Sequence, residues 1–190
     1  MGIAKGQDSQ AENLLQNIPP SLRLATPSIC FVEALTTLEQ AEKYNQDFLQ
    51  RLDIQIHEAE RDENSQIAEL LGTLLRQSKV GFFERKNEIE RRFYVAFNQL
   101  ISKAEIITLN TNIFQESFNR NILENHIMDK LILEFIVHHA RLYPNEIKVF
   151  LSSNSKEFGK REVTEVLQDA GILYFNKTQN FLGWLQSQSN

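Results

Sequence analysis

The second half of the chain decides the fold class, and residues 127–175 read IMDKLILEFIVHHARLYPNEIKVFLSSNSKEFGKREVTEVLQDAGILYF. The run 147–151 is apolar apart from one lysine, which is typical of a parallel strand that is buried on both faces. A second short β-prone run follows at 172–175. Apolar residues at helical spacing fill 127–142 and 161–170. This alternation of strands and helices predicts a parallel sheet flanked by helices.

Shorter elements extend the pattern toward both ends of the chain. Residues 22–24 and 105–109 are candidate strands, and helices are expected at about 112–118 and 179–188. In an open α/β sheet, ligands bind beyond the carboxyl ends of the strands. We therefore expect a functional site among the residues that follow positions 24, 109, 151 and 175.

Long amphipathic segments occupy the middle of the chain, at about 29–61, 65–77 and 80–103. In the segment 65–77 we expect five apolar residues to face inward: Ile67, Leu70, Leu71, Leu74 and Leu75. At 190 residues the chain fits one domain. We predict a single domain over 1–190, with 40–103 as an enlarged helical arm and 1–12 as a flexible tail.

Composition narrows the class of protein. The net charge of −5 argues against a protein that binds nucleic acid through a broad basic face. Cys30 is the one cysteine, which excludes an internal disulfide framework and fits a reducing compartment. No apolar run approaches the roughly 18 residues of a membrane span. We therefore expect a cytoplasmic protein with no membrane association.

Three segments carry candidate chemistry. Asp129 falls in the first turn of the helix expected at 127–142, where an acid also complements the helix dipole. The polar loop 152–159 (SSNSKEFG) follows a buried strand, although its Ser and Asn residues are also typical helix caps. Glu33 is a lone acid between apolar neighbours; it is either on an exposed face or buried with a partner or metal that offsets its desolvation.

Taken together, these segments resemble the PIN-domain family of metal-dependent ribonucleases. The matching stretches are PSICFVEAL at 27–35, DKLILEFIVHHA at 129–140 and SNSKEF at 153–158, followed by GILYF and NFLGWL. The resemblance covers about 22–38 and 105–186. It implies a PIN-like three-layer α/β sandwich and an endoribonuclease that hydrolyses phosphodiesters in single-stranded RNA.

The resemblance also implies roles for individual residues. Glu33, Asp129 and Glu157 would be catalytic acids and, with Asn154, would hold Mg²⁺ or Mn²⁺, which prefer oxygen ligands. Ser155 stands where the family commonly has a further aspartate. Substrate contacts would come from Ser153 and Lys156 in the loop 152–159 and from Lys160 next to it.

One departure leaves two functions open. The family's first strand, which ends in an aspartate, has no counterpart here, so either that strand precedes Met1 in the native protein or the site is degenerate. The first function is a metal-dependent ribonuclease. The alternative is a non-catalytic PIN-like module that binds a protein or RNA partner through its helical arm, and the sequence leaves a homo-oligomer open as well. A third interpretation, an unrelated helical interaction domain, leaves the strand order after 105 unexplained.

Overall fold

The structure is a computed structural model that describes residues 1–188. It contains two compact units. Unit 1 comprises Met1–Gln7 and Glu33–Asn98, and unit 2 comprises Asp8–Val32 and Gln99–Asn190. Unit 1 contains residues 40–98 of the predicted helical arm, together with residues 33–39 and the first seven residues of the chain.

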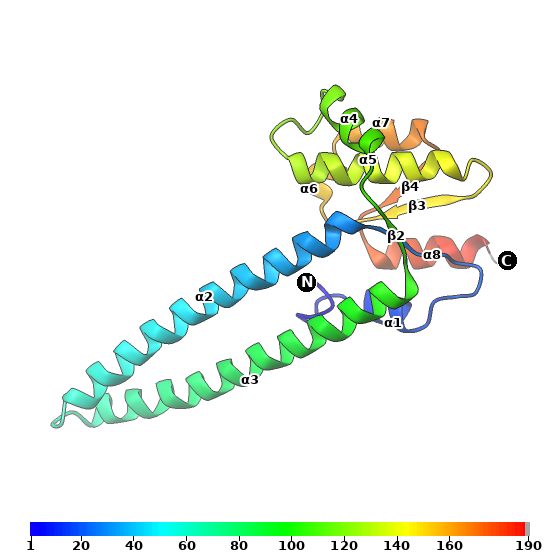
Figure 1. The fold of residues 1–190 in the computed structure, drawn as a ribbon. Coiled ribbons are helices and arrows are strands. Elements are labelled where there is room, and N and C mark those ends of the chain that lie inside the picture. The colour runs from blue at the N-terminus through cyan, green and yellow to red at the C-terminus, as the bar shows by residue number, and fades with distance from the viewer. Residues whose placement is uncertain (189–190) are drawn as a thin grey trace. The chain divides into compact units, whose positions relative to one another are not determined.

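Unit 2 contains the mixed helix and strand part of the chain (Figure 1). Its helices are α1 (Ser9–Gln16), α4 (Thr111–Asn119), α5 (Ile127–Leu142), α6 (Ser155–Phe158), α7 (Arg161–Asp169) and α8 (Thr178–Gln188). Its strands are β1 (Ala25–Pro27), β2 (Glu105–Ile107), β3 (Lys148–Leu151) and β4 (Ile172–Phe175). The prediction of a mixed α/β chain is therefore confirmed, with about 69% of it helical.

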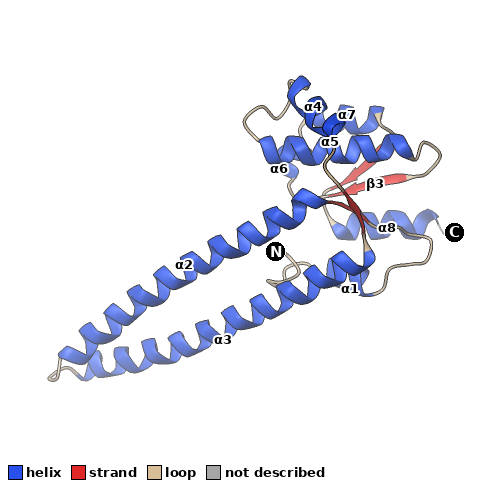
Figure 2. Ribbon diagram, in the orientation of Figure 1, coloured by secondary structure: helices blue, strands red, loops and turns tan. Residues whose placement is uncertain are grey.

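The strands pair in parallel, as expected, but they form two small sheets (Figure 2). In one sheet β1 pairs with β2 and Ala25 lies opposite Glu105. In the other, β3 pairs with β4 and Lys148 lies opposite Ile172. Helix α7 packs on β4, and α8 contacts β4 as well. Figure 1 shows α5 and α7 on one side of the β3–β4 pair and α8 on the other.

The main core of unit 2 lies between α5, α7 and β4. Leu133, Val163 and Leu167 are fully buried, and Ile172 is nearly so. Burial of a leucine, valine or isoleucine side chain contributes roughly 1.5–3 kcal/mol. Because α5 is apolar on most of its circumference, with eight buried residues, its position is closely determined by packing.

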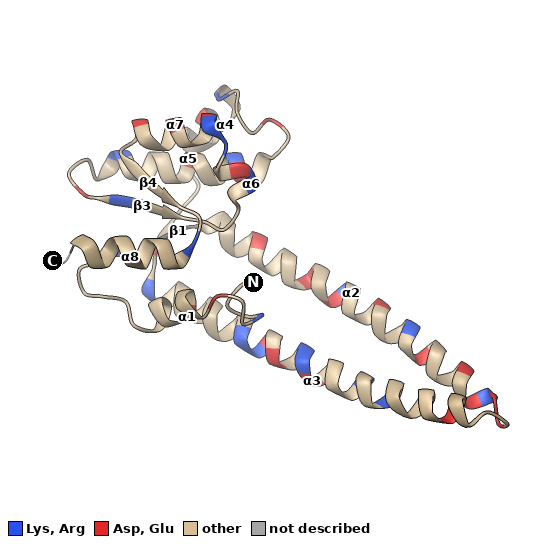
Figure 3. Ribbon diagram, turned by 180° about the vertical axis from the view of Figure 1, so that it is seen from behind, with Lys and Arg blue, Asp and Glu red and all other residues tan. Residues whose placement is uncertain are grey.

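Unit 1 contains most of a helical hairpin formed by α2 (Ser28–Arg61) and α3 (Gln66–Lys103), from Glu33 in α2 to Asn98 in α3. Phe48 and Phe82 contact across it, with ring centroids 4.7 Å apart, and Lys79 Nζ lies 2.5 Å from Asp53 Oδ1. Acidic and basic positions are interspersed along both helices (Figure 3). Residues 1–7 pack against the hairpin, where Ala4 is buried.

Two predictions for the arm were wrong. The segments 65–77 and 80–103 are one continuous helix, and Gly81 lies within it. In addition, four apolar residues that we expected to face inward are exposed: Ile67 (79%), Leu70 (60%), Leu71 (48%) and Leu74 (50%). Within 65–77 the buried residue of α3 is instead Gly72, where an added Cβ would lie 3.6 Å from that of Ala59 in α2. The 3.6-residue period alone does not distinguish between two adjacent apolar stripes.

Part of the segment predicted as a tail, residues 1–12, is helical, because α1 covers Ser9–Gln16. Helix α1 begins at Ser9, where Asp8 Oδ1 accepts a hydrogen bond from Ala11 N at 2.8 Å. Asp8 Oδ2 accepts a second one from Thr178 Oγ1 at 2.7 Å. The strand expected at 22–24 is also displaced, since β1 begins at Ala25. Among residues 1–188, no helix has the length and apolarity needed to cross a membrane.

Candidate acidic site

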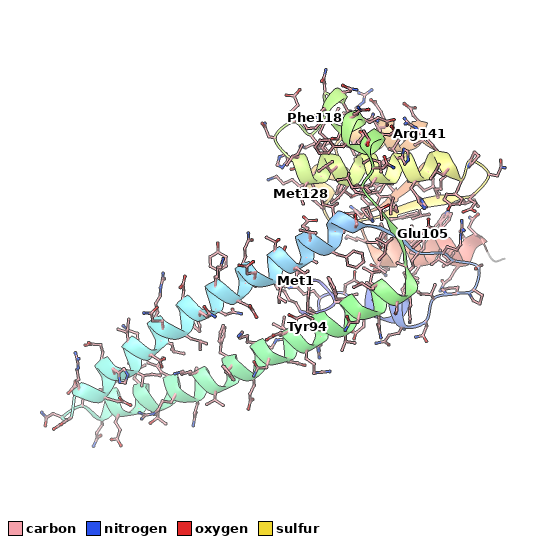
Figure 4. The ribbon with its side chains drawn as sticks, in the orientation of Figure 1. Met1, Tyr94, Glu105, Phe118, Met128 and Arg141 are labelled. Carbon is pink, nitrogen blue, oxygen red and sulfur yellow. The ribbon has the colours of Figure 1, made fainter. Side chains whose placement is uncertain are left out.

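The amino end of α5 presents the first acid of the site. Asp129 lies in the first turn of this helix, and the buried residues of the following turns hold it in place. The loop before α5 is anchored by Leu123, which is 4% exposed and has a positive φ of 54°. His126 occupies the N-cap position and makes no side-chain capping hydrogen bond. Its imidazole is therefore available to other partners. Figure 4 labels Met128, the neighbour of Asp129, at this end of α5.

The second acid comes from the segment that follows β3. This strand ends at Leu151, and the short helix α6 (Ser155–Phe158) carries Glu157, which is 4% exposed. Phe158 anchors α6 by packing edge-on against Phe150, with centroids 4.9 Å apart. Gly159 ends the helix, and a Cβ there would overlap the carbonyl oxygen of Ser155. The glycine thus permits the tight turn that places Glu157.

Five side chains meet at these two chain segments. Asn154 Nδ2 donates a hydrogen bond to Asp129 Oδ1 at 3.0 Å. His126 lies between the two acids, with Nδ1 4.0 Å from Asp129 Oδ2 and Nε2 3.5 Å from Glu157 Oε1. The Lys160 ammonium forms an ion pair with Glu157 Oε2. The arrangement is a pair of carboxylates surrounded by one amide, one imidazole and one ammonium group.

The two acids have opposite electrostatic environments. Burial raises the pKa of Asp129, and the nearby Glu157 carboxylate adds to that effect, while the Asn154 hydrogen bond and His126 oppose it. The hydrogen bond from Lys160 lowers the pKa of Glu157, against the effect of desolvation. Carboxyl groups whose pKa values are displaced in opposite directions are a frequent feature of functional sites, although ion-pair networks produce the same pattern.

The chemistry of these side chains suits a hard divalent cation only in part. Two carboxylates and one amide oxygen are the ligand types that Mg²⁺ takes, and Mg²⁺ commonly uses one or two carboxylates and keeps several waters. Within residues 1–188, however, no three His, Cys, Asp or Glu side chains are grouped as metal ligands. The side chains that could contact a cation here are the two carboxylates and the amide oxygen of Asn154.

The structure brings together four of the predicted residues: Asp129, Asn154, Glu157 and Lys160. Ser153 and Lys156 are exposed beside them. Glu33 is an exposed residue of α2 and belongs to unit 1, so the site described here lies in unit 2 alone. The backbone carbonyl of Glu33 accepts a hydrogen bond from Thr37 Oγ1.

His126 was not among the site residues predicted from the sequence. The signal was its position three residues before Asp129, a spacing at which helical side chains are neighbours. The other strand ends contribute little to the site. Asn110, which follows the expected strand 105–109, caps α4 through Ile113 N at 2.9 Å. His138 and His139 bind separate partners, namely Asn110 and Glu105.

Comparison of the chain with protein-family models, with curated proteins and with solved structures returned no match.

Proposed function

We propose that unit 2 is a PIN-like, divalent-metal-dependent endoribonuclease that acts on single-stranded RNA, with Asp129 and Glu157 as its metal-binding acids. The observation that carries this proposal is the meeting of Asp129, Asn154 and Glu157 between the start of α5 and the end of β3. These residues lie on separate segments, and the position next to the carboxyl end of a parallel strand is a common place for ligands. The resemblance to PIN domains adds the reaction and the substrate.

Each side chain has a distinct part in this proposal. Asp129 and Glu157 hold the cation, and Asn154 orients Asp129 through its amide hydrogen bond. Lys156 and Lys160, on either side of Glu157, would meet the RNA backbone, because lysines beside a site commonly contact phosphate oxygens. A bound Mg²⁺ or Mn²⁺ would supply an activated water and would stabilise the leaving oxygen of the phosphodiester.

The first test is calorimetric titration of the protein with Mn²⁺. We expect saturable, weak binding that is lost in Asp129→Asn. Asp169→Asn is a matched control, because Asp169 is an exposed acid near the end of α7, outside the acidic site. Loss of binding in both variants, or in neither, would contradict the assignment.

The second test is cleavage of a fluorescently labelled single-stranded RNA in Mn²⁺. We expect the unsubstituted protein and Asp169→Asn to cleave it and Asp129→Asn to be inactive with its circular dichroism unchanged. Cleavage by Asp129→Asn at the rate of the unsubstituted protein would remove this residue from the mechanism.

A second candidate, a non-catalytic PIN-like protein that binds a protein partner through its arm, is favoured by a different observation. Ile67, Leu70, Leu71 and Leu74 are exposed on consecutive turns of α3, and an exposed apolar patch often marks an interaction site. This candidate predicts no cleavage at any metal concentration. Sedimentation velocity tests whether this face binds a second copy of the chain. A sedimentation coefficient that rises with protein concentration, and no longer does so in Leu70→Lys/Leu74→Lys, would support self-association. A sedimentation coefficient that does not change with concentration would exclude self-association through this face.

A further inference from the structure

Lys160 supplies a positively charged side chain that is paired directly with a carboxylate of the acidic site. It is the N-cap residue of α7 and has no side-chain capping role. Its ammonium instead reaches back three residues to Glu157 Oε2. The Glu157 side chain is only 5% exposed, whereas that of Lys160 is 40% exposed. The buried partner of this ion pair is therefore fixed, and the exposed partner can exchange with solvent.

All four carboxylate oxygens of the site face a nitrogen atom of the protein. Asp129 Oδ1 accepts from Asn154, and Asp129 Oδ2 and Glu157 Oε1 face the two ring nitrogens of His126. Glu157 Oε2 is held by Lys160. A divalent cation that binds Glu157 Oε2 directly therefore meets the Lys160 ammonium at the same oxygen.

Among those groups, Lys160 opposes a metal ion most strongly. Asn154 is neutral, and its amide can offer an oxygen as well as its NH₂ group. A lysine ammonium is always a donor, has no lone pair to offer a metal, and carries a positive charge that repels one. Its four-carbon stem is flexible, so it can leave Glu157 without any change in the backbone.

We propose that Lys160 is a built-in competitor of the divalent cation: its ammonium and the metal ion exclude one another at Glu157 Oε2. This inference rests on the proposed metal-binding function of Asp129 and Glu157. The protein alone then favours the lysine-bound, metal-free state, and Mn²⁺ affinity is set in part by the free energy needed to release Lys160.

The test compares Mn²⁺ affinity by calorimetry in four proteins: the unsubstituted chain, Lys160→Gln, Lys160→Arg and Arg161→Gln. We expect Lys160→Gln to bind about two- to fivefold more tightly, which is the upper part of the range for loss of a partly exposed ion pair. Lys160→Arg keeps the competing cation and should stay near the original affinity. Arg161→Gln removes one positive charge from the adjacent residue, whose side chain is paired with Glu165 rather than Glu157. It should change the affinity by less than about twofold.

The outcomes separate this inference from the function on which it rests. Equal affinity in Lys160→Gln and the unsubstituted protein, with binding still lost in Asp129→Asn, would overturn the competition and leave the metal site standing. Binding seen in Lys160→Gln alone would support the competition in its strongest form. Absence of binding in all four proteins would overturn both. Near-ultraviolet circular dichroism confirms that each variant is folded before it is titrated.

Discussion

The ion pair between Arg120 and Glu134 gives the sharpest prediction about stability. Arg120 follows α4 as its C-cap, and Glu134 lies in α5. Arg120 Nε and Nη2 donate to the two oxygens of Glu134, the second at 3.2 Å. The Glu134 side chain is fully buried, whereas that of Arg120 is 24% exposed. The two groups therefore differ in how easily each reaches water when the other is removed.

We expect the two single substitutions to have unequal effects on the free energy of unfolding. Arg120→Met leaves a buried carboxylate without a partner and should lower it by about 3–5 kcal/mol. Glu134→Met leaves an arginine that can turn toward solvent, so its cost should be smaller, about 1–3 kcal/mol. Replacing both by methionine removes the unpaired charge and should return the protein to within roughly 1.5 kcal/mol of its original stability.

Urea denaturation followed by fluorescence measures these differences. The one tryptophan, Trp184, packs against Phe175 and Phe181 in unit 2, so its emission reports on the unit that contains the ion pair. The double-mutant cycle then gives the coupling energy. Additive effects, or an Arg120→Met variant within about 1 kcal/mol of the original protein, would refute the argument from burial.

Three further predictions concern single positions. Gly72→Ala should raise the free energy of unfolding by about 0.5–1 kcal/mol, because the added Cβ would lie in ordinary contact, 3.6 Å from the Cβ of Ala59. Gly72→Leu should lower it, because the larger side chain has no such space. Gly81, where no atom lies within 4 Å of an added Cβ, should tolerate both changes in the same urea assay. Asp129→Asn should stabilise the protein at pH 7. Burial raises the folded pKa of Asp129, so the charged carboxylate destabilises the fold at pH values above this pKa. The stability gained in Asp129→Asn should therefore shrink as the pH falls through the folded pKa of Asp129. Glu157→Gln should do the opposite, because Lys160 lowers the folded pKa of Glu157, and the resulting stability is present above the unfolded pKa and lost at acid pH. The free energy of unfolding of the unsubstituted protein and of both variants, measured between pH 3 and 8, checks these two predictions. A difference from the unsubstituted protein that does not change with pH in either variant would contradict them.

Long elements with a strong pattern were predictable from the sequence. The helix expected at 127–142 and the strand expected at 172–175 appear as α5 and β4 with those bounds. Both lie in the core of unit 2, where burial and local preference agree. The three-residue strands β1 and β2 were placed less well, because such short runs carry little periodicity.

The remaining differences have physical causes that a pattern does not contain. Gly81 and its neighbours did not interrupt α3, since an isolated glycine costs a helix only about 1 kcal/mol. Helix α6 was missed because it has four residues and depends on the close approach at Gly159. Asp129, Asn154 and Glu157 were found as separate candidates. Their hydrogen bonds to one another, and the ion pair of Glu157 with Lys160, depend on tertiary packing.

The parallel pairing of β1 with β2 has a consequence for folding kinetics. Ala25 lies opposite Glu105, so the chain between these strands, which contains all of residues 33–98, must form a closed loop. Loop closure becomes slower and less favourable with length, by about 0.6 kcal/mol for each doubling. The α2–α3 hairpin depends on more local contacts such as Asp53 with Lys79, and helices form within about a microsecond. A hairpin that forms first shortens the effective loop, so this helical insertion should slow the pairing of its flanking strands less than an unstructured loop of the same length would.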